Sequence, residues 1–436
     1  MLHVWDHAGA SAAAQCLAQA DHLSQPAPLV DELRLRLAQS SGPRLLVDGL
    51  WLTRAQGGIS RVWSQILRSW RLPGLLSSSA PLALIDRNSH TALVDGFELL
   101  DGSEVDPLDW QSLSACSSEN RDHATSWQAD VFLSSWITAS SPPGTASCCP
   151  ELALVHDCMP ERSQTSPEQL LQRRRWLQGA KAWLAVSAAS ASDVEGLLRL
   201  QPGSVPWCHP SVDPLFQSDI SQTASKRLSM QFRRRIGLVD PFVLMPSVSM
   251  PGSYKNPELV AEALAATGLE HLVFLSSGLP CEPVRDQMLE QFPYLEGRYL
   301  SASLTDLELV IAYREALAVV MPSRIEGFGL PAVEALAAGG RVLLADSRGL
   351  REAGGGACLR FSANSSSELS ALLRLLLEPS TDHWLDHYLN RRRLLHLQHF
   401  QPHLLGLALL AEARRVSRIG VDQNSGRTSQ SALLHP

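Results

Sequence analysis

The chain of 436 residues is 45% hydrophobic and carries a formal net charge of −7 at pH 7. A chain of this length is expected to form two domains of ordinary size together with shorter appendages. The negative charge argues against a nucleic-acid-binding protein, so we expect no nucleic acid among its partners.

Cysteine usage and the lengths of apolar runs indicate the compartment. The eight cysteines form no Cys-x-x-Cys pair and no zinc-finger spacing with histidine, which favours a reducing cytosol. The sequence starts without a basic region followed by an apolar run, and no stretch reaches the roughly 20 apolar residues of a membrane span. We therefore expect a cytoplasmic protein. Peripheral contact with the inner face of a membrane stays open, as does the oligomeric state, and we interpret the arginine clusters 173–175 and 391–393 as solvated helix faces.

The N-terminal part of the chain begins with residues 1–40, whose apolar positions predict a helical extension of unknown purpose, with an oligomer contact and a lid as open alternatives. A strand is expected at 44–47. It is followed by a loop, by Gly57 and Gly58, and by a helix whose apolar positions up to Trp70 follow the 3.6-residue period. A glycine pair is most often a plain turn. Here it follows the first strand, where a doubly wound sheet binds its ligands.

Further strands and helices alternate along the chain, which indicates the α/β class. The remaining strands of the first half are expected at 82–85, 130–133, 152–156 and 182–186. Capping boxes at Ser166–Gln169 and Ser192–Glu195 predict helix starts. The polar residues 86–129 allow no assignment.

His156 and Asp157 end the apolar run ELALVHD, where an α/β sheet presents ligand-binding residues at its strand ends. One interpretation is a packed histidine beside an aspartate that caps the next segment. The other is a histidine that faces a ligand, and we favour it.

The second half has the same α/β pattern. We expect a connection over residues 201–240 and then strands near 241–245, 271–276, 316–321 and 341–345. Thr305/Glu308 and Ser365/Glu368 are expected to cap helices. The domains are therefore predicted at 41–235 and 236–390, with a helix at 391–418 and a disordered tail at 419–436.

Residues 322–340, PSRIEGFGLPAVEALAAGG, follow the strand at 316–321 and predict a loop and then a helix with Pro331 in its first turn and Gly339 after its end. Such a helix start presents unpaired N–H groups that suit a phosphate or a sugar. Taken singly, Glu326 is a solvated loop charge and Glu334 a first-turn acid favoured by the helix dipole.

Four segments together resemble the retaining family-4 glycosyltransferases of the GT-B fold. Residues 322–340 resemble the donor-site signature of that family, and Gly57-Gly58-Ile59-Ser60-Arg61 resembles its Gly-Gly-Ile-x-Arg loop. His156-Asp157-Cys158-Met159-Pro160-Glu161 resembles its His-Asp-x-x-Pro-Glu motif, and Lys255-Asn256 its Lys-Asn pair, with Tyr254 where an arginine usually stands. The resemblance implies two Rossmann-like doubly wound domains that face a central cleft, with a C-terminal helix that crosses back to the first domain.

The resemblance also implies a role for each matched residue. Glu334 would hold the ribose hydroxyls of a nucleotide sugar, and Glu326 and His156 would face the transferred sugar. Lys255 would bind the diphosphate, and Gly57 and Gly58 would face the diphosphate and the acceptor. The amides of Gly327, Phe328, Gly329 and Leu330 would face the sugar and the diphosphate.

We therefore expect a retaining, mannosyltransferase-like enzyme. It would move a hexose from a GDP- or UDP-linked donor to a hydroxyl of a saccharide or lipid-linked acceptor in cell-surface polysaccharide synthesis. No Asp-x-Asp motif is present, so neither a metal nor a cofactor is expected. The alternatives are a protein that binds sugar nucleotides without transferring them, or another GT-B enzyme such as an epimerase or phosphorylase. The chain has three lysines against thirty-four arginines, which makes a lysine at position 255 notable.

Overall fold

The computed structural model shows a chain of two compact α/β units. It describes residues 43–54, 57–71, 82–89, 94–110, 112–161, 165–218, 221–279, 282–378 and 382–430. Among the described residues, unit 1 comprises those between 43 and 211 with 401–430, and unit 2 comprises those between 212 and 400. The expected helical extension at 1–40 lies outside the described residues.

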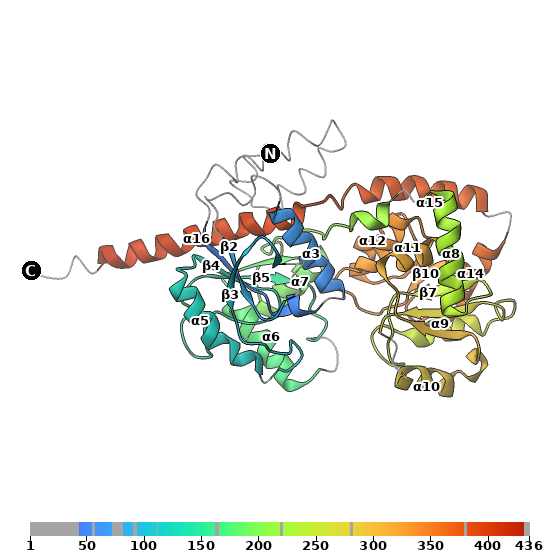
Figure 1. Cartoon of the computed structure of the whole chain (residues 1–436), viewed down its shortest axis with the longest axis horizontal. Coiled ribbons are helices and arrows are strands. Elements are labelled where there is room, and N and C mark those ends of the chain that lie inside the picture. The colour runs from blue at the N-terminus through green and yellow to red at the C-terminus, as the bar shows by residue number, and fades with distance from the viewer. Residues whose placement is uncertain are drawn as a thin grey trace, which may run out of the picture. The chain divides into compact units, whose positions relative to one another are not determined.

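Unit 1 is built on a six-stranded parallel sheet in the order β3-β2-β1-β4-β5-β6. Figure 1 labels β2, β3, β4 and β5 of this sheet. Its strands are β1 (Leu45–Asp48), β2 (Leu82–Asp86), β3 (Glu98–Asp101), β4 (Val131–Ser134), β5 (Glu151–Val155) and β6 (Ala182–Ala185). The strand order reverses between β1 and β4, which is the topological switch point of a doubly wound sheet.

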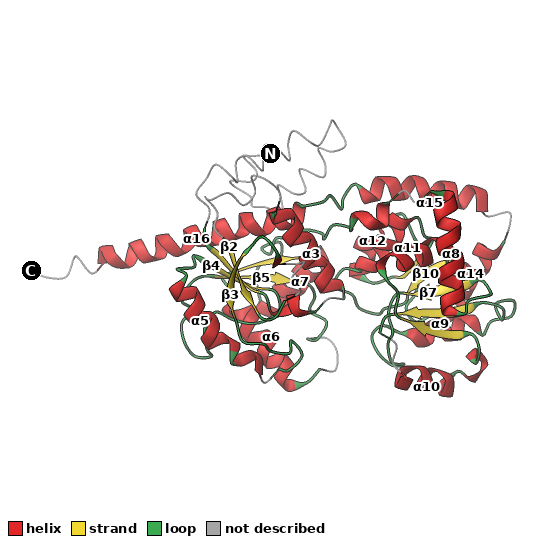
Figure 2. Cartoon of the chain, in the orientation of Figure 1, coloured by secondary structure: helices red, strands yellow, loops and turns green. Residues whose placement is uncertain are grey.

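Helices cover this sheet (Figure 2). They are α3 (Gly58–Trp70), α5 (Cys116–Ser126), α6 (Pro167–Gly179), α7 (Ala188–Leu198) and α16 (Leu404–Gln430), with the short 3-10 helices η1 (Leu50–Thr53) and η2 (Ser112–Ser114). The late helix α16 contacts α3 and strands β4 to β6. Trp70 donates from Nε1 to the carbonyl of Gly406 at 2.9 Å, and a Cβ at Gly406 would lie 1.9 Å from Ser69 Oγ. A glycine is therefore required where α16 meets α3.

Unit 2 repeats the same strand order in its own six-stranded parallel sheet, β12-β11-β10-β7-β8-β9. Its strands are β7 (Phe242–Met245), β8 (Val273–Ser277), β9 (Tyr299–Ala302), β10 (Ala318–Met321), β11 (Val342–Ala345) and β12 (Leu359–Phe361). The switch point lies between β7 and β10. The predicted class, with a doubly wound parallel sheet in each half, is confirmed.

The helices of unit 2 follow the alternation expected of this class. They are η3 (Pro214–Gln217), α8 (Gln222–Ile236), α9 (Pro257–Leu264), α10 (Glu282–Gln291), η4 (Pro293–Leu295), α11 (Asp306–Glu315), α12 (Leu330–Ala338), α13 (Arg348–Gly354), α14 (Ser366–Leu377) and α15 (Asp382–Leu397). Thr305 and Glu308 form the predicted capping box of α11, and Ser365 caps α14. The box predicted at Ser192 is wrong, because α7 begins earlier and is capped by Ser187.

The boundary between the units lies earlier than the predicted position at 235/236. The connecting residues already belong to unit 2, because η3 contacts α11 and α12 and helix α8 contacts α11. Phe232 of α8 lies 6.2 Å from Phe242 of β7 between ring centroids, and Arg233 pairs with Glu315 at 3.0 Å. These contacts make α8 part of the packed second unit.

The C-terminal segment also differs from the prediction of one helix at 391–418 and a disordered tail. Two helices are present, with α15 in unit 2 and α16 in unit 1. Between them lie Pro402, which cannot donate a helical hydrogen bond, and His403 in the left-handed region at φ 76°. Helix α16 continues to Gln430, beyond the expected start of the tail at residue 419, and residues 431–436 lie outside the described part.

Candidate functional site

The loops that follow β7 and β10 lie at the switch point of the unit 2 sheet, where open α/β sheets bind ligands. Asn256 holds these loops together. Its buried amide donates to the carbonyls of Pro322 at 3.1 Å and Ala363 at 2.9 Å. Its backbone is left-handed at φ 60°, which asparagine tolerates better than most residues, and Pro257 then begins α9. Asn256 thus fixes the position of its neighbour Lys255.

Arg324 connects the same two loops a second time. Its backbone N–H donates to the Tyr254 carbonyl at 2.9 Å, and its guanidinium donates to the Ser253 carbonyl and to Glu258, each at 3.1 Å. Sequence reasoning missed this residue, because its partners lie 66 and 71 positions away.

Lys255 and Glu326 meet across these loops. Lys255 Nζ donates to Glu326 Oε1 at 2.7 Å, and the two side chains are 23% and 8% exposed. Lys255 is therefore not a solvent-exposed turn lysine, and Glu326 is not a solvated loop charge. Removing either partner of an ion pair this sheltered would leave an unpaired charge, and the lysine offers a compact charge for an anion.

The loop between Glu326 and α12 is shaped by α13. A Cβ at Gly349 of α13 would lie 2.4 Å from the Glu326 carbonyl oxygen, so only glycine allows this approach. Gly329 caps α12 at φ 110°, and a Cβ there would lie 2.6 Å from Leu350 Cδ2. The two glycines let α13 pack directly under the turn that leads into α12.

The residues between Gly327 and Leu330 turn their larger side chains inward. Phe328 and Leu330 are buried, and the Phe328 ring lies 5.8 Å from that of Phe400. A ligand at this turn would meet backbone amides of the loop and of the α12 N-terminus, where the helix dipole favours negative charge.

Glu334 lies deeper than the sequence suggests. Because α12 begins at Leu330, Glu334 is in the second turn, so the first-turn interpretation is wrong. The side chain is 2% exposed and accepts a hydrogen bond from the Tyr313 hydroxyl at 3.3 Å. The Tyr313 ring lies 5.9 Å from Phe216. The carboxylate is thus held by α11, and its predicted contact with ribose stays a prediction.

In unit 1, His156 follows β5 at the carboxyl end of the strand, as predicted. Its backbone carbonyl accepts from Ser190 Oγ at 3.2 Å, while the buried Nε2 has no hydrogen-bond partner among the described residues. Burial, with a smaller contribution from the charge of Arg173, lowers the pKa of His156 to about 3. The imidazole is therefore neutral at pH 7.

Arg173 of α6 organises the segment after His156. It is buried, and its Nε donates to Glu161 at 2.6 Å and its Nη2 to the Asp157 carbonyl at 2.7 Å. The interpretation of the cluster as a solvated helix face is wrong for this residue, whereas Arg174 and Arg175 are exposed.

Gly57 and Gly58 lie at the start of α3. Gly57 adopts φ 123° before the helix, and Gly58 is its first residue. The helix η1 separates them from β1, so the pair does not follow the strand directly. A Cβ at either position would meet no described atom within 4 Å, which leaves room beside the helix start.

The switch point of unit 1 holds a buried polar network that the sequence did not reveal. Arg87 Nε donates to Asp48 at 2.7 Å, and both side chains are fully buried. Arg87 also donates to Glu119 at 2.6 Å and to Asn120 at 2.7 Å. Asn120 and Thr138 in turn donate to the second oxygen of Asp48. The network ties β1, β2, β4 and α5 together.

The described residues contain neither a candidate metal site nor a candidate membrane span. No group of three or more histidine, cysteine, aspartate or glutamate side chains could hold a metal ion in the part of the chain that the structure describes. None of the helices there has the length and apolar character needed to span a bilayer.

Comparison with known proteins gives one family match. The model of the family "Glycosyl transferases group 1" matches residues 294–383, which run from η4 to the start of α15 and include Glu326 and Glu334 but not Lys255. No curated protein matches the sequence.

Solved structures resemble the whole chain in fold. A glycosyltransferase from Rickettsia africae has a TM-score of 0.63 at 13% identity, covering 86% of this chain and 98% of its own. Anabaena Alr3699/HepE in complex with UDP-glucose has a TM-score of 0.57 at 14% identity, covering 89% of this chain and 100% of its own. WaaG, a glycosyltransferase involved in lipopolysaccharide biosynthesis, has a TM-score of 0.59 at 13% identity over 87% and 98%. This likeness confirms the GT-B fold.

Proposed function

We propose that the protein is a retaining glycosyltransferase that moves a hexose from a UDP- or GDP-linked donor to a hydroxyl of a saccharide or lipid-linked acceptor. The observation that carries the proposal is the Lys255–Glu326 ion pair at the switch point of unit 2, in the loop that leads into α12. The family match over residues 294–383 and the UDP-glucose complex of the Anabaena protein support it.

The diphosphate of the donor is proposed to bind at Lys255 and at the N-terminal amides of α12. Phosphoryl oxygens of the donor would replace Glu326 as the hydrogen-bond partner of the Lys255 ammonium. The Glu326 carboxylate would then face the sugar. Positive charge placed where the leaving diphosphate develops its charge lowers the barrier without a metal ion. Gly327 to Leu330 would supply further N–H groups, and Glu334 the contact with ribose.

His156 is proposed to face the transferred sugar. A neutral imidazole with a free ring nitrogen can exchange hydrogen bonds with a sugar hydroxyl without adding charge. Gly57 and Gly58, where a Cβ would meet no described atom within 4 Å, are proposed to face the diphosphate and the acceptor. We place the enzyme in the cytoplasm, at the inner face of the membrane if its acceptor is lipid-linked, and assign it to cell-surface polysaccharide synthesis.

The test is transfer from UDP-glucose and GDP-mannose to a panel of free saccharides, read by mass spectrometry, with the anomeric configuration of the product read by NMR. We expect a product that retains the donor configuration. Lys255→Ala should remove the product, whereas Lys226→Ala, at an exposed lysine of the same unit, should keep it. An inverted product would refute the retaining mechanism.

A second candidate is a protein that binds nucleotide sugars without transferring them. It is favoured by Tyr254, which stands beside Lys255 where the resemblance expects an arginine, so one positive charge that would stabilise the leaving diphosphate is missing. Calorimetric binding of UDP or GDP with no product from any saccharide would select this candidate. Conversion of the donor sugar without an acceptor would instead select an epimerase.

A further inference from the structure

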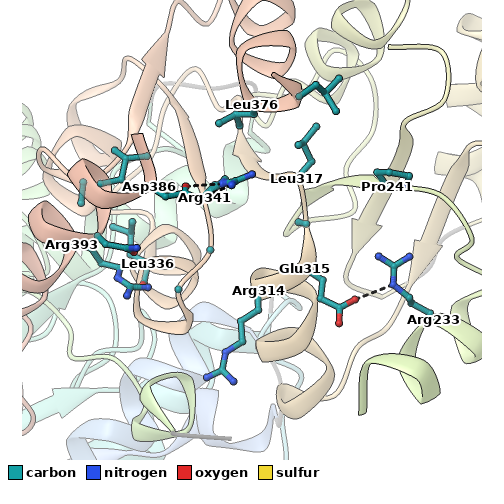
Figure 3. Close-up of a pocket in the computed structure, with 17 residues that line it drawn as sticks. Arg233, Pro241, Arg314, Glu315, Leu317, Leu336, Arg341, Leu376, Asp386 and Arg393 are labelled. Atoms are coloured by element: carbon teal, nitrogen blue, oxygen red, sulfur yellow. Dashed lines mark hydrogen bonds and ion pairs between the residues drawn. The ribbon is translucent and has the colours of Figure 1, made fainter. Parts of the chain in front are cut away.

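A cavity of about 610 Å³, drawn in Figure 3, lies at the amino ends of the parallel strands of unit 2. Its lining includes Pro241, Leu317 and Arg341, which precede β7, β10 and β11. The candidate donor site instead follows the carboxyl ends of β7 and β10. The cavity also receives Gly339 and Gly340 from the end of α12. The two sites are therefore separate, at opposite ends of one helix.

The lining of this cavity carries an excess of positive charge. It includes Arg233, Arg314, Arg341 and Arg393 but only two carboxylates, Glu315 and Asp386, so two positive charges remain in excess. Arg233 pairs with Glu315 at 3.0 Å, and Arg341 binds Asp386 with two hydrogen bonds of 2.9 and 2.6 Å, as the dashed lines in Figure 3 indicate.

Arg393 of α15 is the arginine with unused hydrogen-bonding capacity. Its Nη1 donates to the Leu336 carbonyl at 3.4 Å, while its buried Nε has no partner among the described residues. Burial and then the nearby charge of Arg314 lower the pKa of Arg393. Gly339 makes room for this guanidinium, since a Cβ there would lie 2.8 Å from Arg393 Nη1.

The carbonyl groups at the C-terminus of α12 do not prevent an anion from binding in this cavity. The carbonyls at a helix C-terminus carry partial negative charge and would repel one. However, Arg314 covers the Ala338 carbonyl at 2.9 Å, and Arg393 contacts that of Leu336. The cavity therefore presents guanidinium groups in front of these carbonyls.

From this geometry we propose that the cavity binds a phosphorylated small molecule, with the phosphate at Arg393. The positive charge of Arg314, whose Nε and Nη2 donate to the carbonyls of Ala338 and Ser218, would lie nearby. A phosphomonoester carries about −1.5 to −2 charge at pH 7, which matches the excess of the lining, and guanidinium groups bind it through paired hydrogen bonds. The volume exceeds that of a phosphate ion and falls in the range of small-molecule sites, about 300–1,000 Å³. The site goes beyond the proposed transferase activity and does not depend on it.

The test is isothermal titration of the full-length protein with glucose 1-phosphate, inorganic phosphate and glucose. We expect binding of glucose 1-phosphate, weaker binding of phosphate and none of glucose. Arg393→Gln should weaken glucose 1-phosphate binding at least tenfold. Arg391→Gln, the same change at an exposed position of α15 outside the cavity, should change it less than twofold.

A further variant separates this cavity from the candidate donor site. Lys255→Ala should leave glucose 1-phosphate binding intact, because Lys255 follows the carboxyl end of β7 whereas the cavity lies at the amino ends of the strands. Absence of binding, equal losses in Arg393→Gln and Arg391→Gln, or loss in Lys255→Ala would each overturn the proposal. If Arg393 only caps α12, Arg393→Gln would lower the melting temperature while the protein binds none of the probes, and this result also overturns it.

Discussion

The two units place charged residues at the same topological point of sheets with the same strand order, yet they arrange them differently. In unit 1, Asp48 and Arg87 are fully buried and bonded to several neighbours. In unit 2, Lys255 and Glu326 are joined by one hydrogen bond, and the lysine is 23% exposed. A buried, well-satisfied network stabilises the fold, whereas a partly exposed ion pair can exchange partners with a ligand. Which of the two switch points can bind a ligand is therefore decided by the side chains there and not by the shared topology.

The largest expected effect tests the structural side of this comparison. Asp48→Ala leaves Arg87 as an uncompensated buried charge and should destabilise unit 1 by about 3–5 kcal/mol. Urea unfolding followed by tryptophan fluorescence measures the loss. Thr138→Val, which removes one donor to Asp48 and keeps both charges, should cost less. A loss below 1 kcal/mol for Asp48→Ala, the low end expected of an ordinary buried hydrogen bond, would contradict the assigned role.

The ligand-binding side is tested at Lys255. Lys255→Ala should reduce transfer about 10²- to 10³-fold, the usual cost of removing one donor to a developing negative charge. Lys255→Arg should also lose substantial activity, because the wider planar guanidinium replaces a compact ammonium. Initial rates at saturating donor measure both variants, with melting temperatures as the control for folding. Parental rates in a folded Lys255→Arg variant would refute the point-charge role.

The two glutamates of unit 2 should separate binding from turnover. Glu326→Gln should lower kcat more than nucleotide affinity, and Glu334→Gln should weaken nucleotide binding, each by about 1.5–3 kcal/mol. Calorimetry with the nucleoside diphosphate and steady-state kinetics distinguish the two effects. Tyr313→Phe is the control, because it removes the hydrogen bond to Glu334 and keeps the carboxylate. Unchanged nucleotide affinity in Glu334→Gln would show that this acid only packs.

The contribution of His156 to the stability of the fold should depend on pH. Its pKa is lowered from about 6.5 in the unfolded chain to about 3 in the fold, so the unfolded state binds the extra proton between these values. The wild type therefore loses stability as pH falls through this range, by up to about 1.4 kcal/mol per pH unit from this group. His156→Ala should reduce this slope between pH 6 and 4 and lower turnover at pH 7. An unchanged slope would mean that the imidazole is solvated in the folded state.

The smallest expected effect concerns metal ions. If Lys255 and the α12 amides carry the diphosphate charge, EDTA should change the initial rate less than twofold. Complete loss of activity in EDTA, restored by magnesium or manganese, would assign that charge to a metal instead.

Much of the fold was predictable, and the strands that were missed share one property. β3, β9 and β12 are edge strands with partly exposed residues, so they lack the apolar runs that identify central strands. The remaining edge strand, β6, is mostly buried and was predicted. The central strands β1, β4, β7 and β10 are fully buried and were all predicted. A continuous apolar run identifies a strand that is buried on both faces, and β3, β9 and β12 are not buried in this way.

The candidate site was predictable as separate residues and not as an arrangement. Lys255 and Glu326 were each identified from local motifs, but their contact joins positions 71 residues apart. Arg173 looked like part of a solvated run, because nothing local indicates that it alone turns inward to Glu161. The Asp48 network joins residues up to 90 positions apart and has no sequence pattern of its own.

Because the chain has only three lysines, chemical labelling of Lys255 can be used to detect whether its ion pair with Glu326 is formed. Lys181 and Lys226 are exposed, whereas the amine of Lys255 is held by Glu326. Acylating reagents attack through the nitrogen lone pair, so a salt-bridged ammonium must first break its hydrogen bond and lose a proton. Peptide mass spectrometry of briefly acetylated protein would therefore give two fast internal standards and one slow lysine. Its relative labelling follows the occupancy of this loop without knowledge of the acceptor or the product.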